Sequence, residues 1–509
     1  MSFARVYSAQ ARTTGSSIVS VETDISRGLH SFSIVGLPDK GIEEAKDRVA
    51  AAIKNSGYVS PKTKNQKVTT SLAPADIKKE GSLFDVPIAL SYLLACGDIS
   101  FDPENSIFVG ELSLDGSIRP IQGALPLTLE AQRRGFKNIF IPKDNAKEAA
   151  LVRGVTIYPT ETLSQIVRHI TVNIHDQKSI VPQPQTQISD HYSPEQCIST
   201  IAGQGMAKRA LEIAAAGGHN LALYGPPGTG KSLLAKALTG LVPHLSFEEI
   251  IEVTSLYSSA GVLKHIISQP PFRSPHHTSS YSSIVGGGPQ LRPGEITLAH
   301  RGILFLDEFL EFDRRVIDAL REPLEERHLT ITRNKGSITY PANTQLVIAM
   351  NPCPCGNFGI VNRKCRCTAT TILQYQKKLS GPIIDRIDIW SEVHSIEHDQ
   401  LHSNITSESS TTVRERVVQA RLRQYTRYGE RRTNSEIRLP ELQTKIKTTA
   451  AAQNTLVAYC NKFNISARSH HRIIKVAQTI ADLQQKTSID EEAVLEALQF
   501  RYKQETRTD

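Results

Sequence analysis

Apolar residues in the first 175 positions follow two different periods. Short alternating runs such as residues 17–25 (SIVSVETDI) and 67–73 (KVTTSLA) are typical of half-buried β-strands. Residues 39–57 instead have helical spacing, and Gly57 marks the end of that helix. The apolar positions on this helix are Ile42, Ala45, Val49 and Ile53. Together the two periods predict an α+β domain over residues 1–175.

Three further segments follow along the chain. Residues 176–195 are polar and contain several prolines, so they are expected to form a linker. Strand-like and helix-like runs alternate again over residues 196–400, which predicts an α/β domain with a parallel sheet and helices on both faces. Residues 413–509 have few glycines or prolines and are expected to form an all-helical domain.

Composition adds information about location and partners. The chain has 509 residues, enough for about three domains, and a formal net charge of +8. No apolar run is long enough to span a bilayer, and the first residues, MSFARVYSAQ, lack the apolar core of a signal peptide. We therefore expect a cytoplasmic protein without membrane association. The basic balance favours a polyanionic partner such as DNA.

The strongest motif is GPPGTGKS, which lies between an apolar strand and an amphipathic helix. It fits the P-loop pattern, whose backbone N–H groups surround the phosphates of a nucleotide. The expected ATP-binding residues are Gly225, Pro226, Pro227, Gly228, Thr229, Gly230, Lys231 and Ser232. Lys231 is expected to contact the β and γ oxygens of ATP, and Ser232 to bind Mg²⁺.

Five later residues complete the expected ATPase site, and one of them is a Mg²⁺ ligand. The buried run RGILFLDEF ends in Asp307, expected beside Mg²⁺, and Glu308, expected to polarise the attacking water. The strand TQLVIAMNP ends in Asn351, whose amide could orient the same water. Arg386 and Arg468 are expected to donate to the γ-phosphate, one of them across a subunit boundary. For either arginine alone, a surface ion pair is the commoner role.

This set of motifs resembles the AAA+ ATPases, which usually act as hexameric rings. The 76 residues from Lys231 to Asp307 include a Gly/Pro/Ser-rich segment at about 268–296. That segment is similar to the helix-2 insertion of the magnesium-chelatase-like branch, and residues 413–509 then correspond to its helical lid. Its adjacent His276 and His277 are interpreted as polar loop residues, not as metal ligands.

Longer stretches resemble one family in that branch, the YifB/ComM proteins. They include GQGMAKRALEIAAAGGHNLALYGPPGTGKS, GGGPQLRPGEITLAHRGILFLDE and AMNPCPCG. The resemblance implies a DNA-dependent, homo-hexameric ring ATPase. ComM members are branch-migration helicases in natural transformation, so single-stranded, forked or branched DNA is the implied partner.

The first 175 residues resemble the proteolytic domain of Lon. The similar stretches are KKEGSLFDVPIALSYLL and FVGELSLDGSIRPIQGALPLTLEAQRRGFKNIFIPKDN. The resemblance places Leu83 at the position of the nucleophilic serine, and Leu125 or Leu127 at that of the lysine. Leucine can neither attack a peptide nor accept a proton. Although Ser82 is adjacent, no lysine lies in the following helix to activate it, so we expect a Lon-like fold without peptidase activity.

Three regions are candidate DNA contacts, and the first is the Gly/Pro/Ser-rich segment at about 268–296. The run HLTITRNKGSITYPA has a β-hairpin pattern with Arg333 and Lys335 near its tip, where basic side chains could meet phosphates without reading sequence. An equally simple interpretation is a solvated hairpin tip. Residues 413–432 carry seven arginines, but their apolar stripe favours a packed helix with a charged face.

Four of the seven cysteines lie within residues 353–367, as two C-x-C pairs. Cys353, Cys355, Cys365 and Cys367 could together bind Zn²⁺ in a closed structural site, with no position left for a catalytic water. Four reduced thiols in a loop are the alternative.

Two other functions remain open. One is a magnesium-chelatase motor subunit, although a Lon-like N-terminal block argues against it because such subunits generally begin near the ATPase core. The other is a protein-remodelling ATPase without a DNA role.

Overall fold

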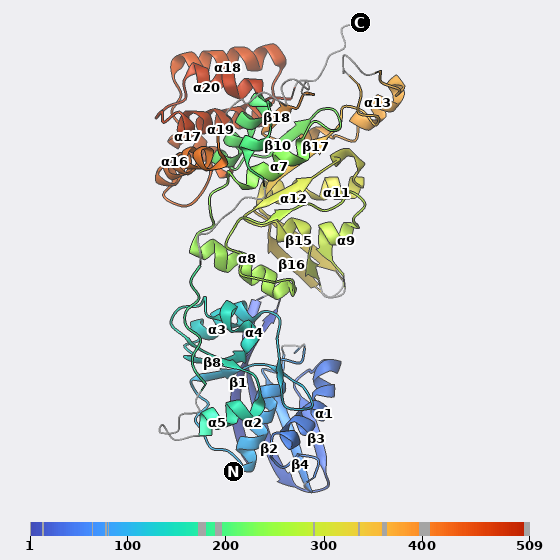
Figure 1. Cartoon of the computed structure of the whole chain (residues 1–509), viewed down its shortest axis with the longest axis vertical. Helices are drawn as coiled ribbons and strands as arrows, with labels where there is room; N and C mark the ends of the chain where they lie inside the picture. Colours follow the sequence, from blue (N-terminus) through green and yellow to red (C-terminus); the bar gives the residue numbers. More distant parts are fainter. Residues whose placement is uncertain are drawn as a thin grey trace. The chain divides into compact units, whose positions relative to one another are not determined.

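A computed structural model describes residues 2–12, 15–63, 65–76, 79, 81–171, 180–188, 196–288, 291–333, 336–358, 364–395 and 408–502. The chain divides into two compact units (Figure 1). Unit 1 comprises Met1–Ser189 and Phe247–Ile267, and unit 2 comprises Asp190–Ser246 and Ser268–Asp509. Among the described helices, none has both the length and the apolar character needed to cross a bilayer.

Unit 1 is built on a seven-stranded mixed sheet in the order β3-β4-β2-β1-β5-β8-β9. Its strands are β1 (Phe3–Arg12), β2 (Gly15–Arg27), β3 (Ser31–Val35), β4 (Gln66–Ala73), β5 (Ser106–Phe108), β8 (Asn138–Pro142) and β9 (Thr156–Thr160). β2 pairs antiparallel with β1 and β4, and all other neighbours are parallel. A separate two-stranded antiparallel ribbon follows β5 in the chain. It consists of β6 (Glu111–Leu112) and β7 (Ile118–Arg119).

Helices cover both faces of the unit 1 sheet, because alternate strand residues point to opposite sides. One apolar cluster contains α1 (Lys40–Asn55), α2 (Asp85–Cys96) and α5 (Leu163–Thr171). The second contains α3 (Ala124–Arg133) and α4 (Lys143–Ala149). Helix α1 begins where expected, with the Ile42 amide donating to Asp39 Oδ1 at 2.9 Å. The α+β architecture expected for this region is confirmed.

Two segments expected outside this domain belong to unit 1. Helix α8 (Phe247–Ala260) packs on α3, with Ile251 against the cluster of Leu125 and Leu151. Residues 180–188, part of the expected linker, bury Ile180 and donate a backbone hydrogen bond from Gln183 to the Ile157 carbonyl at 2.8 Å. The segment is mostly polar, so its composition did not indicate that Ile180 packs into an apolar cluster of unit 1.

Unit 2 contains a five-stranded, fully parallel sheet in the order β11-β14-β17-β10-β18. Its strands are β10 (Leu221–Tyr224), β11 (Phe272–Arg273), β14 (Ile303–Leu306), β17 (Gln345–Met350) and β18 (Ile389–Glu392). Strand β17 is buried along its whole length, as expected for a parallel sheet covered on both faces. The helices that precede the lid are α6 (Gly205–Gly217), α7 (Lys231–Thr239), α9 (Tyr281–Ile284), α10 (Glu295–Leu298), α11 (Arg314–Ala319), α12 (Arg321–Glu326), α13 (Ala369–Gln376) and α14 (Gly381–Ile384).

The two faces of this sheet contribute to separate apolar clusters. Leu221 and Leu223 of β10 face α6 and α7, whereas Ala222 faces the cluster of α9 to α12. The C-terminal helices pack into the first cluster with α6 and α7. They are α16 (Ser410–Tyr428), α18 (Ala450–Phe463), α19 (Ala467–Leu483) and α20 (Glu491–Gln499), whereas α17 (Leu439–Lys445) packs through Leu442 in a smaller cluster with Tyr428 and Ile437. The AAA+ α/β domain and its helical lid are thus present.

The segment expected as an insertion, 268–296, is more than a projecting loop. Its first strand, β11, pairs in parallel with β14 and completes the central sheet. Only afterwards does the chain form the short β12 (Gly286–Gly287) and β13 (Arg292–Pro293) ribbon. Arg273 is fixed to Glu295 by two hydrogen bonds of 2.5 and 2.7 Å.

The basic stretch 413–432 lies on α16 and the loop after it, and most of its arginines have partners within the chain. Arg421 donates to the Ala215 carbonyl at 2.7 Å, at the C-terminal end of α6, where carbonyls lack helical partners. Arg416 pairs with Glu212, and Arg427 with the buried Asp482. These contacts support the packed-helix interpretation.

A buried ion pair in unit 1 provides a test of the fold. Arg48 donates from Nε to Asp85 Oδ2 at 2.9 Å, and the Asp85 side chain is only 1% exposed. Replacing Arg48 by Met leaves this carboxylate without its partner, so we expect unit 1 to lose about 3–5 kcal/mol of stability. Hydrogen exchange of α2 peptides, measured by mass spectrometry, should accelerate accordingly.

Lys62→Met is the matched control, because Lys62 pairs with Asp47 at the surface, with side chains 50% and 77% exposed. Its cost should stay below about 1 kcal/mol. Equal protection of α2 in both variants would contradict the structural role assigned to Arg48.

Candidate functional site

Three neighbouring strands of unit 2 end at the same edge of the sheet. β17 lies between β10 and β14, with Tyr224 paired to Met350 and Leu306 to Ile348. The P-loop follows β10, Asp307 follows β14 and Asn351 follows β17. Parallel strands place their carboxyl ends together, and this is where open α/β sheets bind ligands.

The P-loop begins at a glycine that no other residue could replace without displacement. Gly225 has φ of +157°, and a Cβ there would lie 2.1 Å from the Val393 carbonyl oxygen. Its amide donates to the Met350 carbonyl at 3.2 Å, which joins the loop to β17. The loop is therefore held close to the sheet edge before the chain turns into α7.

Lys231 occupies the centre of the site. Its Nζ donates to the carbonyls of Gly225 and Pro226 at 2.7 and 2.6 Å, and to Asn351 Oδ1 at 3.1 Å. The residue is 8% exposed. Burial lowers the pKa of Lys231 to about 8, against the attraction of Asp307 and Glu308, which acts in the opposite direction. The structure thus brings together Lys231 and Asn351, which lie 120 positions apart.

Ser232 and Asp307 form a pair of oxygen donors beside Lys231. The Ser232 hydroxyl donates to Asp307 Oδ2 at 2.6 Å, and the Glu308 amide donates to Asp307 Oδ1 at 2.9 Å. A hydroxyl and a carboxylate are ligands that suit Mg²⁺, which prefers oxygen donors and retains several waters. The donor set fits the expected metal.

Glu308 lies at a strained position and has a partner that the sequence did not indicate. It has φ of +50°, in the left-handed region, directly after strand β14. Its carboxylate lies 3.2 Å from His277 Nδ1. His277 is therefore neither an isolated loop residue nor part of a metal cluster in the described chain. It contacts the carboxylate expected to activate water.

Arg386 and Arg468 meet each other at a shared acid. Arg386 Nη2 lies 2.8 Å from Glu325 Oε2, and Arg468 pairs with the other carboxylate oxygen of Glu325. Burial lowers the pKa of Arg386, and the nearby charges of Arg472 and Arg321 add to the effect. Within the described chain, no hydrogen bond or ion pair joins either arginine to Lys231 or Asp307. No motif had indicated Glu325, which lies on α12.

A second charged group links the ATPase core to the lid. Asp388 is 5% exposed, and it accepts from Arg472 of α19 at 2.5 Å and from the Asn220 amide at 3.0 Å. Burial alone would raise the pKa of Asp388, but Arg472 and His219 hold it well below the usual range. Arg472 lies four residues after Arg468 on the same helix, a spacing that could have indicated a shared face.

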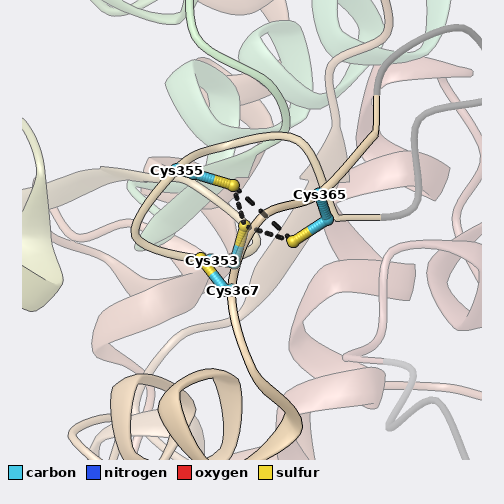
Figure 2. Close-up of side chains that lie close together, drawn as sticks. All are labelled: Cys353, Cys355, Cys365 and Cys367. Atoms are coloured by element: carbon cyan, nitrogen blue, oxygen red, sulfur yellow. Dashed lines mark hydrogen bonds between the residues drawn. The ribbon is translucent and has the colours of Figure 1, made fainter.

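The four clustered cysteines converge, and Figure 2 shows their sulfur atoms pointing toward one another. All four Sγ atoms lie within 4.8 Å of each other. Cys353 Sγ is 3.4 Å from Cys355 Sγ and 3.7 Å from Cys365 Sγ, and the Cys355 to Cys365 distance is 3.6 Å. Zinc bound tetrahedrally at about 2.3 Å would hold its sulfurs about 3.8 Å apart. The cluster therefore has the dimensions of a four-thiolate site.

Backbone amides also converge on these sulfurs. The Phe358 amide donates to Cys353 Sγ at 3.3 Å. Amides of Arg366 and Asn357 lower the pKa of Cys355 to about 6. Such donors stabilise thiolates, the form in which cysteine binds metal.

The candidate DNA-binding hairpin is formed by β15 (His328–Arg333) and β16 (Gly336–Pro341). Arg333 is exposed, whereas Lys335 lies outside the described residues. The hairpin packs beside the β12–β13 ribbon, where the Tyr340 hydroxyl donates to the Leu291 carbonyl at 2.6 Å. Two elements of the expected DNA surface are therefore adjacent.

The Lon-like positions in unit 1 are occupied by apolar side chains. Leu125 and Leu127 are fully buried, and Leu83 packs against the apolar clusters. Ser82 hydrogen bonds to Glu111, a carboxylate. No lysine side chain hydrogen bonds to Ser82 in the described part of unit 1.

Family comparisons cover most of the chain. Residues 21–145 match the family described as "Subunit ChlI of Mg-chelatase", 197–401 "Magnesium chelatase, subunit ChlI", and 407–501 "Magnesium chelatase, subunit ChlI C-terminal". The first of these matches falls in unit 1, so the similarity to chelatase families is not confined to the ATPase region.

Two other proteins are similar over part of the chain. A Lon protease of Azospirillum brasilense is 26% identical over 170 residues, 30% of this chain and 21% of that protein. The DNA replication licensing factor Mcm6 of Drosophila pseudoobscura pseudoobscura is 26% identical over 187 residues, 36% of this chain and 20% of that protein.

Two relatives match the chain almost end to end. The competence protein ComM of Haemophilus influenzae is 40% identical over 508 residues, 98% of each chain. YifB of Escherichia coli is 40% identical over 507 residues, 98% of this chain and 97% of that protein. With a Lon-like unit, a P-loop unit with the AAA+ sheet and a helical lid, the chain belongs to the YifB/ComM family of magnesium-chelatase-like AAA+ proteins.

Proposed function

We propose that the protein is an ATP-dependent DNA motor, a branch-migration helicase that acts on DNA during recombination and natural transformation. The observation that carries the proposal is the group formed by Lys231, Ser232, Asp307 and Asn351 at one edge of a parallel sheet. The similarity to a competence protein supports the proposal that this ATPase acts on DNA, in the cytoplasm.

The residues divide the chemistry between them. When ATP binds, Lys231 Nζ leaves its carbonyl partners and donates to phosphate oxygens instead. The negative charge of the phosphates stabilises the protonated amine. Glu308 polarises the attacking water, and the Asn351 amide orients it. Ser232 and Asp307 would hold Mg²⁺, which neutralises charge on the phosphates.

Completion of the site requires the arginines, and this favours a homo-hexameric ring. Arg386 and Arg468 share Glu325 within one chain, so at least one must leave that carboxylate to reach a phosphate. In a ring, an arginine of the neighbouring subunit meets the nucleotide directly. ATP turnover then moves the β15–β16 hairpins and the adjacent insertion along the DNA backbone without reading bases.

The four-cysteine cluster is proposed to be a closed structural zinc site. Its sulfur spacing suits a tetrahedral ion, and four protein ligands leave no coordination position for a reacting water. Hydrolysis therefore belongs to the P-loop edge of the sheet.

The decisive experiment measures ATP hydrolysis with and without forked or single-stranded DNA, together with strand displacement on a branched substrate. DNA should stimulate the wild-type rate. Glu308→Gln should lower turnover by about 10²–10⁴-fold, because the general base is lost, while nucleotide binding persists.

DNA contact is tested in the same assay with Arg333→Glu, which should lower the stimulation by DNA. Arg134→Glu, the same substitution at an exposed arginine directly after α3 of unit 1, serves as the control. Hydrolysis that ignores DNA would contradict the motor and favour a chelatase-type or protein-remodelling ATPase. The family descriptions keep the chelatase function as the second candidate.

Unit 1 is proposed to lack peptidase activity, because leucines occupy both dyad positions: the partly buried Leu83, and the buried Leu125 or Leu127. An unfolded protein substrate should remain intact when incubated with the protein and ATP. Cleavage that disappears in a Ser82→Ala variant would overturn this proposal.

Nucleotide binding should depend on pH through Lys231. Below pH 8 the amine is already charged, so affinity should be nearly constant. Above pH 8 the free amine is largely neutral, and binding to phosphates must take up a proton. The dissociation constant should then rise by up to about tenfold per pH unit. Calorimetry in two buffers of different ionisation enthalpy should show proton uptake near pH 9 and none near pH 7. The opposite pattern would contradict the assignment.

A further inference from the structure

The four-cysteine loop touches the P-loop. Gly356 lies in the left-handed region at φ of +76°, and a Cβ added there would be 2.4 Å from Pro227 Cδ and 2.8 Å from its Cγ. Only a hydrogen atom fits between the Gly356 backbone and the Pro227 ring. Pro227 in turn follows Pro226, whose carbonyl accepts from Lys231. A movement of Gly356 therefore reaches the phosphate-binding backbone within one residue.

The same loop is joined to the site by a second route. Cys353 comes two residues after Asn351, whose side chain accepts from Lys231 at 3.1 Å. Cys353 is fully buried, and its carbonyl accepts from the Gly356 amide at 2.9 Å. The tight turn 353–356 therefore begins two residues after Asn351 and ends at Gly356, which contacts Pro227 of the P-loop.

We propose that a metal ion bound by the four cysteines holds this turn against Pro227, and that its presence sets the affinity of the P-loop for nucleotide. The inference rests on the proposed zinc site and ATP site, and it deepens them by coupling one to the other. The ion acts as a brace for the nucleotide site, at a distance from the reacting atoms.

The physical reason is the chemistry of the sulfur group. Three of the sulfurs lie 3.4 to 3.7 Å apart and all four lie within 4.8 Å, so they repel one another when ionised, and a divalent cation replaces that repulsion with four bonds. Cys365 and Cys367 enter from the far arm of the loop, so an ion bound by all four sulfurs would bond that arm directly to the turn at 353–356. Since metal binding free energy acts as folding free energy, its loss should release the turn.

The test uses the full-length chain and two readouts that do not depend on turnover. Zinc content is measured by mass spectrometry, and the affinity for a fluorescent ADP analogue is measured by titration. We expect about one zinc per chain, and at least about tenfold weaker nucleotide binding after the metal is stripped by a chelator. Adding back Zn²⁺ should restore the affinity.

Cys365→Ser and Cys367→Ser remove ligands without altering the turn that contacts Pro227. Both should lose zinc and bind nucleotide as weakly as the stripped protein, with circular dichroism unchanged. Cys460→Ser, on α18, is the matched control and should retain zinc and affinity. Cobalt substitution should give the absorption bands of a tetrahedral thiolate site in wild type and in the control only.

The outcomes separate the coupling from its two premises. Zinc bound at one per chain, with nucleotide affinity unchanged on its removal, would overturn the coupling and leave both sites intact. Absence of zinc and of cobalt bands would overturn the metal site and the brace with it. Failure of the zinc-loaded protein to bind nucleotide would instead refute the ATP site.

Discussion

The buried amine of Lys231 is the contact on which the nucleotide site depends. It joins the P-loop carbonyls after β10 to the asparagine after β17, while its neighbour Ser232 reaches the acid after β14. All of these bonds require that the three strands end at one edge in parallel register. Backbone pairing between the strands therefore fixes where β10, β14 and β17 end. The polar residues that follow these strands are brought together as a result.

Buried charge extends this arrangement from the sheet to the lid. Asp388 precedes β18, yet its main cationic partner, Arg472, lies on α19. Arg468 of the same helix shares Glu325 with Arg386 of the core. Because a buried carboxylate without its partner is costly, core and lid cannot separate at this point without penalty. Any rearrangement of the arginines toward a nucleotide must therefore be coordinated with the lid.

The sequence predicted what short-range pattern determines and missed what only three-dimensional packing determines. The P-loop, the parallel sheet of unit 2 and the helical lid could all be predicted, because motif and periodicity are local properties. The two C-x-C pairs predicted a cluster of four cysteines, and their sulfur atoms do converge in the structure. Glu325 could not be found, since nothing distinguishes it from other acids on a surface helix. The contact of His277 with Glu308 could not be predicted either, because it depends on how β11 enters the sheet.

Helix α8 makes unit 1 discontinuous in the chain. The Phe247–Ile267 segment reaches unit 1 only after the P-loop and α7 have been made. Until then, Leu125, Leu151 and Val152 lack the apolar cover provided by Ile251 and Ile266. During synthesis, the first 189 residues consequently emerge as a domain with one incomplete surface. Folding of the N-terminal unit thus finishes only when part of the ATPase region has left the ribosome, which links the maturation of the two units in time.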